Sequence, residues 1–234
     1  NDYCKSMLTP PKTLVIGISG GIDSSVVSTL CALTGKKTIT ISMPIRQIKS
    51  QHDLSLMQGE WLSSKFNNVE FNLIELEKTF NSFKETLSKF DNEHGLANSR
   101  ARLRMATLYQ VAAANSGIVV GTGNKIEDFG VGFYTKYGDG GVDISPIADC
   151  TKTQVWEMGK YLGISKEIIN AEPTDGLWED GRSDVKQLGM TYQDLEKAMT
   201  NKNDPNYKKY LKIREKNIHK MKPIPVCKFN NENS

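Results

Sequence analysis

Short apolar runs alternate with longer amphipathic segments through the first half of the chain. Runs rich in β-branched residues predict buried strands at residues 13–16, 38–43, 69–76 and 118–123. Apolar residues at helical spacing predict helices between and after them, at 26–34, 53–66, 76–92 and 97–115. Alternating strands and helices favour right-handed crossovers, so the predicted fold is α/β, an open, mostly parallel, twisted sheet with helices on both faces.

The second half of the pattern is less regular. Residues 124–150 are rich in glycine and show little periodicity, and a loop of that length in a compact domain is usually functional. A helix is expected over 151–162, between a capping Thr151 and Gly163. Residues 172–188 are expected to form another loop, and two short helices are expected near 192–199 and 205–218.

Composition and charge narrow the class of protein. A chain of 234 residues can bury one sizeable core, so a single domain over 1–234 is the default expectation. The net charge of +3 is too small to indicate nucleic-acid binding, although it suits polyanionic small substrates. No run reaches the length of a membrane span and no signal peptide opens the chain, so we expect a cytoplasmic protein without a membrane partner. The four scattered cysteines indicate buried thiols in a reducing compartment rather than disulfides or a metal site.

The most informative stretch, Ile16–Ser25, joins the first predicted strand to the first helix. It reads Ile-Gly-Ile-Ser-Gly-Gly-Ile-Asp-Ser-Ser, a turn of small residues leading into a helix N-terminus. Unpaired backbone N–H groups and the positive end of a helix dipole make such a turn an anion site, so we expect it to bind phosphate. The Lys-Ser/Thr pair of a Walker A loop and the Gly-x-Gly-x-x-Gly of a dinucleotide fingerprint are both absent. The pattern Ser-Gly-Gly-x-Asp-Ser instead resembles the pyrophosphate loop of the ATP pyrophosphatase superfamily.

Other charged residues lie at the ends of predicted strands. Arg46 follows the second strand, where ligands bind in open parallel sheets, and it either lies against a nucleotide or is a solvated loop arginine. Carboxylates of the 124–150 loop are candidates to hold Mg²⁺ beside phosphates. Asp23 has a simpler alternative as the N-cap of its helix, and Glu127 has one as an ordinary loop carboxylate.

Six sequence blocks, in order, resemble the NAD synthetase family. They begin at Ser19, Ala101, Gly121, Phe133, Pro173 and His219. The block Thr-Lys-Tyr-Gly-Asp-Gly-Gly-x-Asp, from Thr135 to Asp143, is the most specific of them. Asp175-Gly176 departs from the Ala-Asp or Ala-Gly that is usual in the family. The family fold is Rossmann-like, and its members are homodimers with the dinucleotide site at the subunit interface.

The resemblance implies a two-step ligase reaction that uses ATP, deamido-NAD and ammonia. The nicotinate carboxylate attacks the α-phosphorus of ATP, pyrophosphate leaves, and ammonia then displaces AMP to give NAD. Family analogy assigns Mg²⁺ to Asp23 and Glu127, and names Asp23, Glu127, Lys152 and Asp143 as catalytic candidates. The residues assigned to ATP are Gly17, Ile18, Ser19, Gly20, Gly21, Ile22, Asp23, Ser24, Arg46, Thr122, Lys152 and Thr174. The residues assigned to deamido-NAD are Arg102, Lys136, Asp143, His219 and Lys220, of which the last two have a solvated tail as the alternative.

Two other classes of protein remain open from the sequence. One is a different ATP pyrophosphatase, such as a tRNA thiolase or a GMP synthetase core, but the chain shows neither reactive cysteines nor a basic RNA-binding extension. The other is a non-catalytic ATP-binding module. Because the phosphate loop begins so near the start of the chain and no cysteine has the setting of a catalytic thiol, we expect free ammonia rather than glutamine to be the nitrogen source.

Overall fold

The computed structural model describes residues 1–178 and 181–228. Its elements in chain order are α1 (Asp2–Ser6), β1 (Thr13–Gly17), α2 (Ile22–Leu33), β2 (Lys37–Ser42), α3 (Lys49–Lys65), β3 (Val69–Leu73), α4 (Glu77–Thr86), the 3₁₀ turn η1 (Ser88–Phe90), α5 (Glu93–Ala114), β4 (Gly117–Val119), the π-helical turn η2 (Lys125–Val131), α6 (Lys152–Leu162), α7 (Lys166–Asn170), α8 (Asp184–Leu188), α9 (Tyr192–Thr200) and α10 (Tyr207–Met221). None of the described helices is long and apolar enough to span a membrane.

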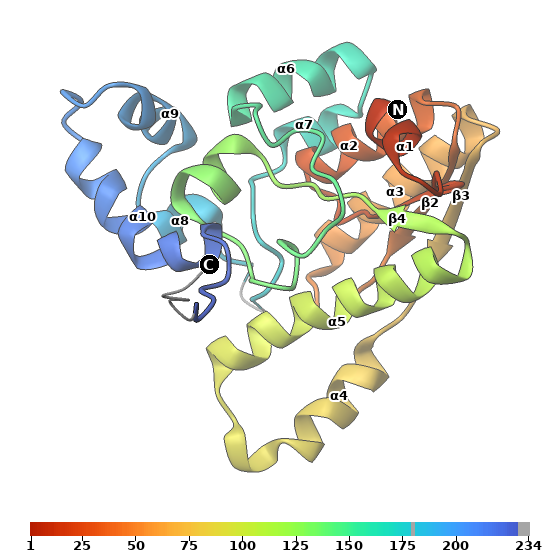
Figure 1. Cartoon of the computed structure of the whole chain (residues 1–234), viewed down its shortest axis with the longest axis horizontal. Helices are drawn as coiled ribbons and strands as arrows, with labels where there is room; N and C mark the ends of the chain where they lie inside the picture. The colour runs from red at the N-terminus through yellow and green to blue at the C-terminus, as the bar shows by residue number, and fades with distance from the viewer. Residues whose placement is uncertain (179–180, 229–234) are drawn as a thin grey trace, which may run out of the picture.

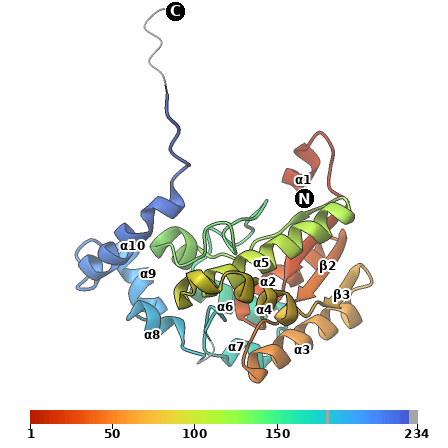
Figure 2. The same ribbon diagram turned by 90° about the horizontal axis from the view of Figure 1, so that it is seen from below.

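The four strands form one all-parallel sheet in the order β3-β2-β1-β4, which confirms the predicted α/β fold (Figure 1). Leu14 and Ile16 of β1 face one way and pack with α2 and α6 in one buried cluster. Val15 faces the other way and packs with β2 and α5 in a second cluster. Figure 2 shows α3 and α5 on opposite sides of the strands. The prediction of helices on both faces is therefore confirmed.

A third buried cluster lies away from the sheet. It joins η2 to the C-terminal helices through Ile126, Val131, Leu195 and Tyr210. In Figure 1 these C-terminal helices lie on the opposite side of the molecule from the strands. Trp156 of α6 contacts both this cluster and the first one. The helix α6 therefore connects the sheet layer to the C-terminal helices.

Several predicted boundaries change in the structure. The 124–150 loop contains the seven-residue π-helical turn η2, which begins where Asn124 accepts hydrogen bonds from the backbone N–H groups of Ile126 and Glu127. The 172–188 loop ends in the short helix α8, and the helix expected over 76–92 ends at Thr86. The expected helix over 151–162 is confirmed, with a capping box at Thr151 and a left-handed Gly163.

The cysteine prediction is partly wrong. Cys4 and Cys31 are buried in the first cluster, but Cys150 is half-buried and Cys227 is exposed. Cys4 lies in α1 and is 3% exposed. The amphipathic turn of α1 directs that one apolar side chain against the core.

Candidate active site

The phosphate loop lies at the carboxyl end of β1, in the middle of the sheet. From β1 the chain passes to β2 on one side, and it later returns through β4 on the other, so the β1–β4 edge is a topological switch point. Ligands of open parallel sheets bind in the crevice at such a point. Asp23 follows β1 and Glu127 follows β4. The topology therefore brings the two predicted carboxylates together.

The loop itself is held by its serine hydroxyls. The Ser24 hydroxyl accepts from the backbone N–H of Ser19 at 3.2 Å and donates to the carbonyl of Gly21 at 3.0 Å. Gly20 has a φ of +87°, and a Cβ there would lie 2.6 Å from the carbonyl oxygen of Gln51. Only glycine satisfies both the left-handed backbone and that close approach. The helix α2 then begins at Ile22, with its N-terminus directed at the loop.

Lys152 bridges the two carboxylates. Its Nζ lies 2.5 Å from Oδ2 of Asp23 and 2.8 Å from Oε1 of Glu127, and its side chain is only 2% exposed. Asn124 completes the cluster, because its side-chain amide donates to Oδ1 of Asp23 at 2.9 Å. The N-cap of α2 is Gly21 and makes no side-chain cap hydrogen bond. The alternative in which Asp23 serves only as a helix cap is therefore wrong.

The electrostatics of the cluster follow from this bridge. Burial raises the pKa of Glu127, but the charge of Lys152 and its hydrogen bond outweigh burial and hold that pKa below its ordinary value. Burial also disfavours the charged form of Lys152, yet the two carboxylates raise its pKa above the ordinary value. Two carboxylates beside a phosphate loop suit Mg²⁺, which is typically held by one or two carboxylates together with substrate phosphates. The residues present therefore fit that cation.

Two residues that the sequence reasoning missed extend the cluster. The hydroxyl of Tyr192 lies 2.5 Å from Oε1 of Glu127 and 2.7 Å from Oδ2 of Asp184. Asp184 is 4% exposed, and burial together with the nearby charge of Glu127 raises its pKa to about 7. Neither residue falls within a recognised sequence block. Asn124 was also missed, although an Asn three residues before Glu127, just after a strand, is a typical helix-capping signal.

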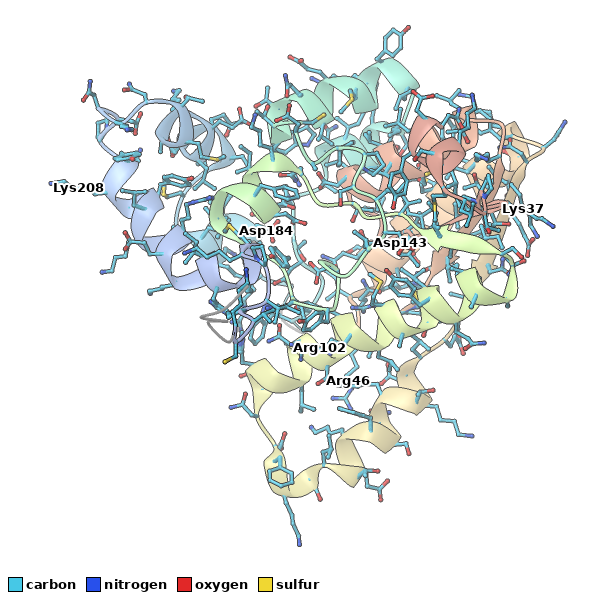
Figure 3. The ribbon with its side chains drawn as sticks, viewed as in Figure 1. Lys37, Arg46, Arg102, Asp143, Asp184 and Lys208 are labelled. Atoms are coloured by element: carbon cyan, nitrogen blue, oxygen red, sulfur yellow. The ribbon has the colours of Figure 1, made fainter. Side chains whose placement is uncertain are left out.

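The residues assigned to the dinucleotide lie on the 132–143 segment and on the helices α5 and α10, each of which contacts that segment. Arg102 of α5 donates from Nε to the carbonyl of Lys136, and Lys220 of α10 donates to the carbonyl of Tyr134 at 2.7 Å. Asp143 lies at the other end of the segment, where its carboxylate accepts from the backbone N–H of Val119 at 2.7 Å. Figure 3 shows Arg102 beside α5 and Asp143 near β4. His219 is exposed on α10 next to Lys220.

The remaining ATP candidates lie around the loop. Thr174 accepts from the side-chain amide of Gln51, a residue whose backbone carbonyl lies against Gly20. Thr122 follows β4, between the sheet and η2. Arg46 has a φ of +51° and forms an ion pair with Glu77 of α4 at 3.4 Å (Figure 3).

A cavity of about 510 Å³ opens beside Arg46, between α4, α5 and the segment around Trp178. Arg46, Arg100 and Arg182 contribute basic side chains to its lining, and Phe80 and Trp178 contribute rings. The structure thus places Arg46 against α4 and beside this cavity.

Comparison with known proteins assigns a family. The family model described as NAD synthase matches residues 2–233. The NH(3)-dependent NAD(+) synthetase of Alkaliphilus metalliredigens is 39% identical over 222 residues, which cover 91% of this chain and 89% of that protein. The NMN synthetase of Francisella tularensis superposes with a TM-score of 0.88 at 32% identity, over 97% of this chain and 93% of that one. The NH3-dependent NAD synthetase of Campylobacter jejuni gives a TM-score of 0.75 at 26% identity, over 97% and 93% of the two chains.

Proposed function

Because the chain belongs to the NAD synthase family, we propose that it amidates deamido-NAD with ammonia at the expense of ATP, giving NAD, AMP and pyrophosphate. The observation that carries this proposal is the pairing of Asp23 and Glu127 through Lys152, beside the phosphate loop. The relatives named NH(3)-dependent NAD(+) synthetase support it over most of the chain length. The same pairing argues against a non-catalytic ATP-binding module, which has no need of two carboxylates directed at one cation.

The first step is attack by the nicotinate carboxylate on the α-phosphorus of ATP. Both partners are anionic, so catalysis depends on alignment and on charge neutralisation more than on a nucleophilic side chain. Gly17–Ser24 cradle the pyrophosphate with backbone N–H groups and with the N-terminus of α2. Asp23 and Glu127 would hold Mg²⁺, which would screen the negative charge of the phosphates. Lys152 supplies a further positive charge from the buried side.

The second step is attack by ammonia on the adenylated carboxyl, with AMP as the leaving group. We assign Arg46, Thr122, Lys152 and Thr174 to ATP, and Arg102, Lys136, Asp143, His219 and Lys220 to deamido-NAD. In support of the second set, Arg102 and Lys220 both meet the 132–143 segment, which carries Lys136 and Asp143.

A homodimer in the cytoplasm is part of the proposal. Tyr109 and Tyr137 are 39% and 59% exposed. The Tyr109 hydroxyl lies 3.1 Å from Oδ1 of Asp143, and Tyr137 follows Lys136, whose carbonyl accepts from Arg102, so both exposed rings adjoin assigned dinucleotide residues. A dimer interface there would cover the assigned dinucleotide residues. Light scattering after size-exclusion chromatography tests this proposal, and we expect the molar mass of a dimer.

A second candidate substrate is the mononucleotide. The solved structure with a TM-score of 0.88 is named as an NMN synthetase, whereas the NAD synthetase structure from Campylobacter jejuni gives 0.75. The same chemistry would then amidate nicotinate mononucleotide, which has no adenylate half. The two candidates share the adenylation step and the ammonia step, and they differ only in the length of the acceptor.

One assay separates these possibilities. The protein is incubated with ATP, Mg²⁺ and ammonium, together with either deamido-NAD or nicotinate mononucleotide, and the products are resolved by chromatography. We expect NAD, AMP and pyrophosphate in equal amounts from deamido-NAD. A higher kcat/KM for the mononucleotide would favour the second candidate, and no pyrophosphate with either acceptor would refute both. Glutamine without ammonium, as a further arm, is expected to give no NAD.

A further inference from the structure

The hydroxyl of Tyr192 occupies an unusual position, between two carboxylates on different elements. It lies 2.5 Å from Oε1 of Glu127 in η2 and 2.7 Å from Oδ2 of Asp184 in α8. Tyr192 is 3% exposed and Asp184 is 4% exposed, so bulk water does not mediate these contacts. The chain therefore holds three polar groups in a row that ends on a predicted metal ligand.

The number of protons fixes the direction of this row. A tyrosine hydroxyl has one proton and can donate it to only one acceptor. Two short contacts to carboxylate oxygens therefore require a second proton, carried by one of the carboxyl groups. Oε1 of Glu127 already accepts from the ammonium group of Lys152, so Glu127 is the charged carboxylate and accepts from the Tyr192 hydroxyl as well. The second proton therefore lies on Asp184, which donates to the Tyr192 oxygen.

The ring of Tyr192 is fixed as firmly as its hydroxyl. It packs edge-to-face on Trp156 with the ring centroids 5.9 Å apart, and Nζ of Lys152 lies 4.8 Å from its centroid. Lys152 and Tyr192 both contact the same oxygen of Glu127, Oε1. Two directed contacts on one oxygen hold Oε1 in place and leave Oε2 outside both of them.

We propose that Tyr192, held by Asp184, is a positioning residue that orients the carboxylate of Glu127 for its cation. The inference rests on the proposed function, because that function assigns Mg²⁺ to Glu127. Groups that hydrogen-bond to a metal-ligating side chain orient it, and their removal typically weakens metal binding by about 10- to 100-fold. Tyr192 and Asp184 therefore belong to the working site through Glu127.

Four variants test the proposal. Tyr192→Phe removes the hydroxyl and keeps the ring packing on Trp156. Tyr210→Phe is the matched control, because Tyr210 is buried in the same cluster but lies outside the contacts to Glu127. Asp184→Ala removes the donor to Tyr192. Asp184→Asn keeps a neutral donor of the same shape and is expected to restore the wild-type behaviour.

The readout is direct binding of Mn²⁺, followed by electron paramagnetic resonance, in the presence of an ATP analogue with a methylene group between the α- and β-phosphates. We expect Tyr192→Phe and Asp184→Ala to raise the Mn²⁺ dissociation constant by about 10- to 100-fold. We expect Tyr210→Phe and Asp184→Asn to stay close to wild type. Thermal unfolding of each variant in the same buffer shows whether a loss of binding follows a loss of folding.

Equal Mn²⁺ affinity in wild type and Tyr192→Phe would overturn the inference and leave the proposed function intact. The same loss in Tyr192→Phe and Tyr210→Phe would also overturn it, because it would indicate a general effect on the cluster. A wild-type protein that binds no Mn²⁺ beside the analogue would instead refute the cation site of the proposed function, and this inference with it.

Discussion

Lys152→Met should lower the unfolding free energy of this protein more than the substitution of any exposed lysine. The methionine has nearly the length of lysine and keeps the apolar part of the side chain, but it removes the charge between Asp23 and Glu127. The lysine side chain is 2% exposed and each carboxylate side chain is 16% exposed, so water cannot replace the lost ammonium group. Two like charges would then face each other in a largely buried site.

The expected magnitude follows from what remains after the substitution. Removing one partner of a buried ion pair typically costs about 3–5 kcal/mol, because it leaves an uncompensated buried charge. In a protein of this size, each kcal/mol of lost unfolding free energy lowers Tm by about 2–4 °C. The expected decrease in Tm is therefore about 6–20 °C at neutral pH.

Thermal unfolding followed by circular dichroism measures the effect. The control is Lys160→Met, because Lys160 is exposed on the same helix α6. Its Tm should stay within about 2 °C of wild type, since surface substitutions usually change stability by less than 0.5 kcal/mol. Addition of Mg²⁺ should raise the Tm of Lys152→Met more than that of wild type, because the cation replaces the missing charge.

The pH dependence gives a sharper test. Without Lys152, burial is no longer offset by a positive charge and should raise the pKa of Glu127 above its ordinary 4.5. When the pKa of a carboxyl group is higher in the folded than in the unfolded protein, the folded protein loses stability as the pH rises between the two pKa values. The gap in Tm between wild type and Lys152→Met should therefore be smaller at pH 5 than at pH 8. A loss below 1 kcal/mol, or a gap that widens toward pH 5, would refute the reasoning.

Three further predictions concern other parts of the site and the core. Gly20→Ala should lower ATP-dependent pyrophosphate release by about 100-fold, because the added Cβ displaces the loop by about an ångström. The control is Gly35→Ala, at φ +75° with open space around it, which should cost only about 1 kcal/mol of stability and no activity. Equal effects of the two substitutions on activity would contradict this prediction. Arg102→Ala should raise KM for deamido-NAD with little change in KM for ATP, and an equal rise in both would mean that Arg102 is misassigned. In thiol titration with a disulfide reagent, the exposed Cys227 should react first. Cys31 should react only on unfolding, because burial raises the pKa of the Cys31 thiol to about 12. A fast reaction that persists in Cys227→Ser would contradict this prediction.

The parts of the site that the sequence predicted are those encoded locally. The strand, the small-residue turn and the helix around Gly20 are contiguous, so their order alone predicts a phosphate loop. Glu127 was one of several loop carboxylates and was selected through family resemblance; it follows a strand whose carboxyl end lies at the same edge of the sheet as that of β1. Lys152 was identified through family resemblance, and its role as a bridge became visible only in the structure.

The parts that the sequence missed depend on distant contacts. Tyr192 lies 65 residues beyond Glu127, and its hydroxyl has no local partner in the sequence pattern. Asp184 was assigned to a loop because α8 has only five residues and too few apolar positions to show helical periodicity. The turn η2 was missed because a π-helical turn produces no 3.6-residue pattern. In each of these cases tertiary packing, rather than local preference, decides the conformation.

The third cluster has a consequence for how the enzyme is made. Ribosomes release the N-terminal end first, and segments can fold as they emerge. All four strands and the phosphate loop lie before Val120, so a nascent chain holds the complete sheet well before α9 is synthesised. The contact between Glu127 and Tyr192 can form only after the last third of the polypeptide, which contains Tyr192, has been synthesised. A truncated chain that ends before Tyr192 could form the phosphate loop but would lack the hydroxyl that orients the Glu127 carboxylate. The active site is therefore completed only when the C-terminal helices have been synthesised.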